Sequence, residues 1–304
     1  MENKETNPLL CDIESGSCEM PGQHTAADHQ AQLNGTKPVK IIYFTDPICS
    51  SCWGIEPQLK KLKLEYGHLI DIEYRMGGLL PNWDYNSGGI SKPADVAVHW
   101  EEAGAYYDMP IDGDVWYVDP LESSYPPSIA VKAAELQSEE KAVYFMRKLR
   151  EGLFLSKKNI AKWENIADAA KEAGLDVGQL EKDYESAGKM MFQADLNLAR
   201  KMGVRGFPTI FLLNEDGMQE LVYGSRPYDA YENAIKKLHP EAVKNKYAND
   251  YAHLFSQFDT MTAKEFSVLS GMPRNEVEGY LNKLVSEGKL KRFDSKNGGL
   301  WSTK

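Results

Sequence analysis

Cysteine is scarce in this chain, with four residues in a sequence of 304. Secreted domains held together by disulfides are short and dense in cysteine, so that class is excluded. The sequence also lacks an apolar run of about 18 residues, the length that a membrane-spanning helix requires. Residues 1–30 lack the basic and apolar regions of a secretory signal. We therefore expect a cytoplasmic protein with no membrane partner.

Positive charge is also in short supply. Lys and Arg number 35 against 45 Asp and Glu, which gives a formal net charge of −10. A chain of this charge repels phosphate backbones on average, so nucleic acid is not expected as a partner. The length of 304 residues is sufficient for a large core and for more than one domain.

The most informative feature that is present is a strand pattern leading into a Cys-x-x-Cys motif. Residues 39–45 are apolar without alternation, which is typical of a buried parallel strand. Cys49 and Cys52 follow, and a helical pattern continues to Tyr66 with a kink expected at Pro57. The first thiol thus lies at a helix N-terminus, where a thiolate is favoured. This order predicts a thioredoxin-like redox motif.

The remaining pattern completes an α/β fold. Further strands are expected at residues 69–76, 208–213 and 221–223, with a hairpin turn at 214–217 and a last helix at 228–238. Between the two βα halves lies a helical insertion at about 93–203, with segments that start near Pro93, Pro127, Glu139, Asn159 and Asp176. We assign residues 37–240 to one thioredoxin-like domain that includes this insertion.

Pro208 follows Phe207 at the start of the predicted 208–213 strand. In thioredoxin-like folds a cis-proline lies opposite the Cys-x-x-Cys motif, and X-Pro bonds are the ones for which the cis form costs little. The alternative is an ordinary trans proline that begins a strand. We expect the cis form.

The role of Cys49 and Cys52 has two interpretations. They form either a dithiol/disulfide pair, with Cys49 as nucleophile and Cys52 as resolving thiol, or a pair of small residues at a strand–helix junction. Ser50 and Ser51 between them add no positive charge, so at most a moderate lowering of the thiol pKa is expected. Fold does not dictate function, so no catalytic residue is assigned.

Residues 1–36 form a polar leader without apolar periodicity, and we expect it to be largely disordered unless another part of the protein holds it in place. It carries four side chains of the types that bind zinc: Cys11, Cys18, His24 and His29. The spacing between the cysteines is wider than in usual zinc sites, so the alternative is a solvated tail with incidental thiols. Zinc in the leader is the one cofactor considered.

Residues 241–304 comprise a polar linker with some helix and a small C-terminal module. A helix at 262–270, a turn, a helix at 275–287 and a hairpin predict a winged-helix-like module. Glu276 and Glu278 lie in the first turn of the second helix, where carboxylates oppose phosphates. A protein-docking role is therefore favoured over DNA binding.

Aromatic residues are dense between positions 80 and 130. Two explanations stay open, namely packing of the insertion and an aromatic binding face. The residues concerned are Trp83, Tyr85, Trp100, Tyr106, Tyr107, Trp116, Tyr117 and Tyr125.

Two motifs carry a resemblance to known families. Residues 45–54 (TDPICSSCWG) and 203–209 (GVRGFPT), together with the helical insertion, resemble the DsbA/FrnE branch of the thioredoxin superfamily. The full layout of leader, DsbA-like body and C-terminal module is similar to the SpxH (YjbH) family of adapter proteins.

This second resemblance implies an adapter that binds the transcription factor Spx and promotes its degradation by the ClpXP protease. It also implies that the Cys/His leader is associated with zinc. The alternative function is a cytoplasmic thiol–disulfide oxidoreductase that uses Cys49 and Cys52. Serines between the cysteines and the lack of an export signal separate this chain from oxidising DsbA enzymes.

Overall fold

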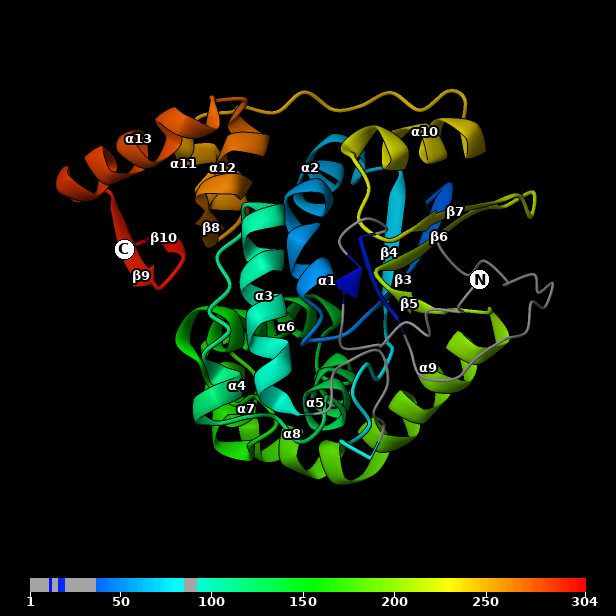
Figure 1. Ribbon diagram of the computed structural model, residues 1–304. Helices are drawn as coiled ribbons and strands as arrows, with labels where there is room; N and C mark the ends of the chain where they lie inside the picture. The colour runs from blue at the N-terminus through cyan, green and yellow to red at the C-terminus, as the bar shows by residue number, and fades with distance from the viewer. Residues whose placement is uncertain (1–10, 13–15, 20–36, 85–91) are drawn as a thin grey trace, which may run out of the picture.

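The computed structural model describes residues 11–12, 16–19, 37–84 and 92–304. Its central sheet has the strand order β4-β3-β6-β7 (Figure 1). These strands are β3 (Val39–Thr45), β4 (Ile70–Met76), β6 (Thr209–Asn214) and β7 (Gln219–Tyr223). β3 pairs parallel to β4 and antiparallel to β6, and β6 and β7 form the expected hairpin. The predicted thioredoxin-like α/β arrangement is confirmed.

β3 is buried on both faces, which explains its apolar composition. Val39, Ile41 and Tyr43 contact a core that includes α2 (Glu56–Tyr66) and α10 (Tyr228–Leu238). Ile42 and Phe44 point to the opposite face and join the larger core of the helical insertion. Successive side chains of a strand alternate between faces, so an unbroken apolar run is needed for a strand between two cores.

The helix after the cysteine motif is divided in two. α1 (Ser50–Gly54) ends at Ile55, and α2 begins at Glu56 with Pro57 in its first turn. The prediction of one kinked helix was therefore wrong in its form. Proline is tolerated in a first turn because its missing N–H has no intrahelical acceptor there.

The insertion is helical, as predicted, and lies below the sheet in Figure 1. It contains α3 (Pro93–Tyr107), α4 (Val115–Val118), α5 (Tyr125–Glu135), α6 (Glu139–Ser156), α7 (Trp163–Glu172), α8 (Val177–Asp183), a π-helical turn (Tyr184–Gly188) and α9 (Lys189–Lys201). The short α4 was not predicted, because four residues are too few to show a helical period. Within the described residues, no helix is both long and apolar enough to cross a membrane.

Part of the leader is ordered against the body. β1 (Cys11–Asp12) and β2 (Ser17–Glu19) pair with each other, and β2 also pairs with β5 (Gly206–Phe207). These residues meet the condition under which order was expected in the leader, because β5 holds them in place. Strands of two or three residues have no readable period, and this pairing depends on a partner far along the chain.

The C-terminal residues form a three-stranded sheet and helices above the insertion in Figure 1. The elements are α11 (Tyr251–Gln257), β8 (Thr260–Thr262), α12 (Ala263–Ser270), α13 (Arg274–Ser286), β9 (Leu290–Ser295) and β10 (Gly298–Thr303). Residues 239–250 contain no helix, contrary to expectation. The helix, turn, helix and hairpin occur in the predicted order, and the winged-helix-like assignment stays an interpretation of that order.

Candidate functional site

Cys49 follows the end of β3 after a three-residue loop and caps the N-terminus of α1. The backbone N–H of Cys52 donates to the Cys49 sulfur at 3.1 Å, so the cysteine side chain replaces a polar cap. Both cysteines are free thiols and both have no exposed surface. The sequence placed this pair correctly, but it gave no indication that the pair is sealed from solvent.

The leader covers the cysteine pair. Cys18 in β2 is itself fully buried and is disulfide-bonded. The Cys49 thiol donates to the Cys18 sulfur at 3.5 Å, and Ser51 Oγ lies 3.6 Å from the same sulfur. Sequence reasoning had assigned Cys18 only to a zinc set in the leader and missed this contact. Nothing local to either motif signals it.

Pro208 lies next to the leader strand, because β2 pairs with β5 and β5 ends at the residue before Pro208. The Phe207–Pro208 peptide bond is cis, as the sequence predicted. Cys18 is opposite Phe207 in the backbone register of β2 and β5. Cys18 therefore connects the two signature motifs, because its backbone pairs with the residue before Pro208 and its sulfur contacts Cys49.

Arg150, from α6, is a functional residue that the sequence did not reveal. It is fully buried, donates to Glu56 Oε1 at 2.6 Å and to Thr45 Oγ1 at 2.7 Å, and interacts electrostatically with both cysteines. A buried guanidinium holds a charge that neutral pH cannot remove. The sequence carried no signal specific to Arg150, because α6 also buries Arg147 and Glu151.

Burial and Arg150 act in opposite directions on the two thiols. Desolvation raises the pKa of Cys49 well above its usual range, and its hydrogen bond to Cys52 raises it further. Burial also opposes ionisation of Cys52, but the hydrogen bond from Cys49 and the charge of Arg150 outweigh it and lower the pKa of Cys52. The sequence set only an upper limit on the lowering of a thiol pKa in this motif, and the structure places the lowering at Cys52 because burial outweighs the favourable interactions at Cys49.

The walls of the site come from α3 and the loop after β3. Tyr107 and Ser51 share a hydrogen bond of 2.8 Å, and the Tyr107 ring lies directly over Gly54. Asp46 accepts hydrogen bonds from the backbone N–H groups of Ile48 and Leu79, which holds two loops together. Burial raises the pKa of Asp46 to about 6 despite these bonds.

The zinc prediction stays a prediction. His24 and His29 lie outside the described residues, as does the side chain of Cys11. Cys18 lies within them and is bonded to another sulfur, whereas a cysteine binds zinc as a thiolate.

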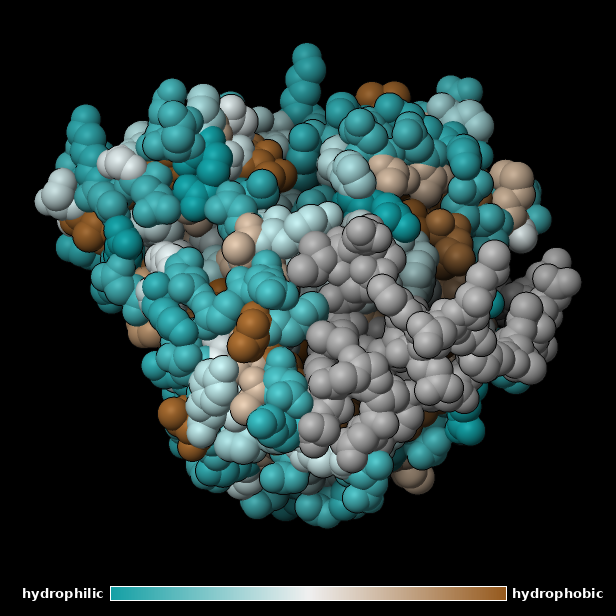
Figure 2. Space-filling model, in the orientation of Figure 1, coloured by the Kyte–Doolittle hydropathy of each residue, from teal (hydrophilic) through white to brown (hydrophobic). Residues whose placement is uncertain are grey.

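The aromatic residues of the insertion mainly pack against one another. Trp100 and Trp116 are buried with their rings edge to face at 5.1 Å, and Trp83 packs on Trp116. Tyr106 and Tyr117 are exposed, whereas Tyr85 lies outside the described residues. Figure 2 shows apolar side chains in small separate patches on the visible described surface. The packing explanation accounts for most of the cluster.

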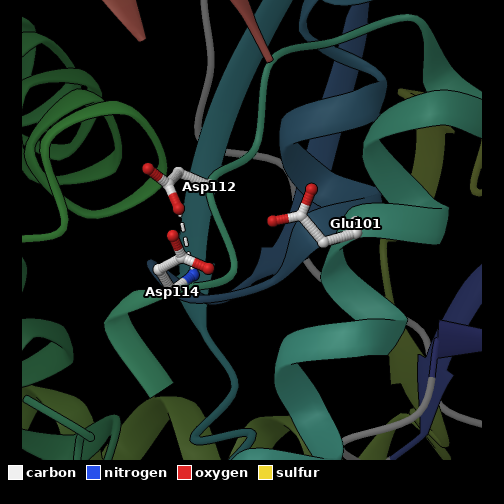
Figure 3. A group of neighbouring side chains, drawn as sticks. All are labelled: Glu101, Asp112 and Asp114. Atoms are coloured by element: carbon white, nitrogen blue, oxygen red, sulfur yellow. Dashed lines mark hydrogen bonds between the residues drawn. The ribbon is translucent and has the colours of Figure 1, made fainter. Parts of the chain in front are cut away.

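Three carboxylates form the one further group with metal-ligand chemistry among the described residues. Glu101 and the neighbouring Asp112 and Asp114 face a common space (Figure 3). Lys296 Nζ lies 3.0 Å from Glu101 Oε1 and 2.8 Å from Asp114 Oδ1. A lysine of the C-terminal module thus already neutralises this cluster, and we assign it to module docking.

The comparisons with known proteins agree with this architecture. Residues 43–233 match the thioredoxin family model. Among solved structures, a putative protein disulfide isomerase from Nitrosomonas europaea has a TM-score of 0.58 at 20% identity, covering 66% of this chain and 97% of its own. The cytosolic disulfide reductase DsbM from Pseudomonas aeruginosa has a TM-score of 0.54 at 20% identity, covering 66% of this chain and 99% of its own. These likenesses confirm the DsbA-type fold.

Curated relatives extend over more of the chain. The ClpXP adapter protein SpxH of Halalkalibacterium halodurans is 35% identical over 301 residues, which is 97% of each chain. SpxH of Bacillus subtilis is 30% identical over 88% of this chain and 90% of its own. The chain therefore belongs to the SpxH family of ClpXP adapter proteins, and its residues 43–233 have a thioredoxin-like fold.

Proposed function

We propose that this protein is a cytoplasmic adapter that binds Spx and promotes its degradation by ClpXP. The extent of the match carries the proposal. The disulfide-exchange proteins above cover 66% of the chain, whereas the SpxH relative covers 97%. The SpxH relative thus also matches residues of this chain that the disulfide-exchange proteins leave uncovered.

The way the C-terminal module is attached supports this function. Arg147 of α6 donates to both oxygens of Glu265 at 2.7 and 3.1 Å, and Lys60 of α2 lies 2.8 Å from the same carboxylate. These three side chains are buried between module and body. A client held on such a fixed platform stays close to the protease, which raises the effective concentration of its tail there.

The test is degradation of purified Spx by ClpXP with and without this protein. We expect a faster loss of Spx in its presence, and the same acceleration by the Cys49→Ala, Cys52→Ala double variant. Equal rates with and without the protein would overturn the proposal.

A second candidate function is thiol–disulfide exchange on other proteins. The observation in its favour is that Cys49 and Cys52 are both free thiols next to the buried Arg150. Reduction of a disulfide-bonded peptide at a rate abolished by the double variant would support it. If the variant keeps full adapter activity, catalysis is not how the adapter works.

We further propose that the leader binds zinc when its cysteines are reduced. Two thiolates and two imidazoles form a donor set that suits zinc. Zinc content is to be measured on reduced protein and on the His24→Ala, His29→Ala variant. Equal zinc in both would contradict the ligand set.

A further inference from the structure

The leader strand occupies the position of an extended peptide bound beside the cysteine pair. β2 adds antiparallel to β5, the strand that ends immediately before Pro208. Strand addition of this kind is a general way to bind extended segments, because the backbone supplies the affinity. Gly16 fixes the hairpin to the body, since Ser225 donates its N–H to the Gly16 carbonyl at 2.6 Å.

The sulfur atoms are arranged for reaction. Cys18 is oxidised and Cys49 is reduced, yet their sulfurs lie 3.5 Å apart. This separation is that of a near-attack arrangement, in which reacting atoms are about 3–3.5 Å apart. Cys52 lies one helical turn after Cys49 and bonds to its sulfur through the backbone N–H, so a second thiol is ready behind the first.

We propose that the leader disulfide is an internal substrate of the Cys49/Cys52 pair. The Cys49 thiol passes its proton to the Cys52 thiolate, and the Cys49 sulfur attacks Cys18 Sγ. A Cys49–Cys18 bond forms, and the former partner sulfur of Cys18 leaves as a thiolate, which takes up that proton and leaves Cys52 ionised again. The strand register places Cys11 opposite Cys18, so we assign Cys11 as this leaving group. This assignment also follows from the count of four cysteines, of which two are free.

The second step completes the exchange. The Cys52 thiolate attacks Cys49 Sγ, a Cys49–Cys52 bond forms, and Cys18 leaves as a thiolate. Two electrons pass from the Cys49/Cys52 dithiol to the leader disulfide, and the protons lost by the first pair are taken up by the second. No external oxidant or reductant enters the balance. The chain thus has two redox isomers, with the disulfide either in the leader or in the motif.

The proposal is independent of client binding, so it is tested on the full chain alone. Cys52→Ala removes the resolving thiol and should accumulate the Cys18–Cys49 bond. The variant is prepared with the leader disulfide closed, incubated without oxygen or added thiol, quenched with acid and alkylated, and its disulfides are mapped. We expect the Cys18–Cys49 link within the monomer, independent of protein concentration. Cys49→Ala is the control, and it should form no link from Cys18 to Cys52.

A docking variant separates proximity from chance encounter. Gly16 has φ +66°, and a Cβ there would lie 2.7 Å from the Ser225 Cβ, so Gly16→Val should displace the hairpin without changing a cysteine. Combined with Cys52→Ala, it should lower the yield of the Cys18–Cys49 link and speed alkylation of Cys49, each by about tenfold. Gly271→Val is the matched control, since Gly271 also has positive φ but no neighbour within 4 Å.

The outcomes are decisive in both directions. A Cys18–Cys49 link that depends on Gly16 supports the internal exchange. A Cys52→Ala protein that folds, as judged by circular dichroism, but retains only the leader disulfide overturns it. An equal yield of the link in the Gly16→Val background overturns it as well.

Discussion

Arg150 sets the charge beneath the cysteine pair. Its guanidinium bonds to Glu56 and Thr45 and to the Asp46 carbonyl, the last at 3.2 Å. These three acceptors belong to the segment that surrounds the motif, so one side chain of the insertion both orders this segment and favours a thiolate at Cys52. Because one guanidinium makes all these contacts, replacing the Arg150 side chain should affect both the stability of the fold and the pKa of Cys52.

Arg150→Met should destabilise the fold and raise the pKa of Cys52. It leaves Glu56 without its 2.6 Å partner, and breaking a buried ion pair costs about 3–5 kcal/mol. Urea unfolding measures the first effect, and the pH dependence of thiolate absorbance measures the second. Arg150→Lys keeps the charge, so its Cys52 pKa should stay below that of the Met variant. Identical titrations of the two variants would contradict this role.

Gly54→Ala should destabilise the protein through a steric clash. The new methyl group would lie 2.4 Å from Cγ of the Tyr107 ring, and overpacking a core of this kind costs about 1–3 kcal/mol. Gly279→Ala in α13 is the control, because its Cβ meets nothing within 4 Å and a helix gains roughly 0.5–1 kcal/mol from alanine. Thermal unfolding should therefore shift in opposite directions. If the unfolding temperatures of both variants shift in the same direction, the Tyr107 ring moves aside at little cost and the clash is not destabilising.

For single residues, the sequence predicted the features that depend only on neighbouring positions in the chain. Cys49, Cys52 and the cis bond at Pro208 follow from short patterns with a fixed backbone geometry. Arg150 and the burial of Cys18 depend on contacts between distant segments, for which no local pattern exists. The same limit explains why the sequence could not tell which of the two thiols has the lowered pKa.

Among the elements, predictions succeeded where one period is sustained. The strands of the central sheet and the helix at Tyr228–Leu238 were found by their pattern, because burial on defined faces fixes their composition. The break at Ile55 and the leader strands were not found. A break depends on how two helices pack, and a strand of three residues exists only because β5 pairs with it.

The packing of α12 on the body depends on one carboxylate. Glu265 accepts the backbone N–H of Thr262 at 2.7 Å, which caps the helix, and also binds Arg147 and Lys60. Burial opposes its ionisation, but these two cations outweigh burial and lower the pKa of Glu265 to about 2. The cap and the docking of α12 are thus the same interaction.

Glu265→Gln should weaken this docking and change its pH dependence. The folded pKa of about 2 lies below the unfolded value of about 4.3, so the stabilisation is present above pH 4.3 and lost as pH falls through 2. The shift corresponds to about 3 kcal/mol. Hydrogen exchange of α12 across this pH range measures it.

Glu287→Gln is the control for that measurement, because Glu287 pairs with Lys289 at the surface. It should leave the exchange of α12 unchanged. If wild type and Glu265→Gln show the same slope with pH, the carboxylate does not carry the docking.

In the whole molecule, the C-terminal module is held at several places, one of which is the contact of Arg274 Nε in α13 with Asp108 Oδ2 at 2.8 Å. Two further attachments are the buried network at Glu265 and the tip of the β9–β10 hairpin, where Lys296 meets Glu101 and Asp114. Asn297 adds a hydrogen bond from its Nδ2 to the Ile111 carbonyl at 2.7 Å. Two attachments fix an orientation, whereas one permits rotation about it.

Lys296→Glu should release the hairpin tip while the Glu265 network holds. A fourth carboxylate would then face Glu101 and Asp114, and like charges at this distance repel. We expect faster proteolysis at residues 239–250 and faster exchange in β9 and β10, with α12 little changed. Lys291→Glu, an exposed change on β9 of the same hairpin, is the control. Because the surface contact is screened by ions, added salt should reduce the difference between Lys296→Glu and wild type. Equal proteolysis of the two proteins at low salt would mean that the Lys296 contacts do not hold the hairpin tip in place.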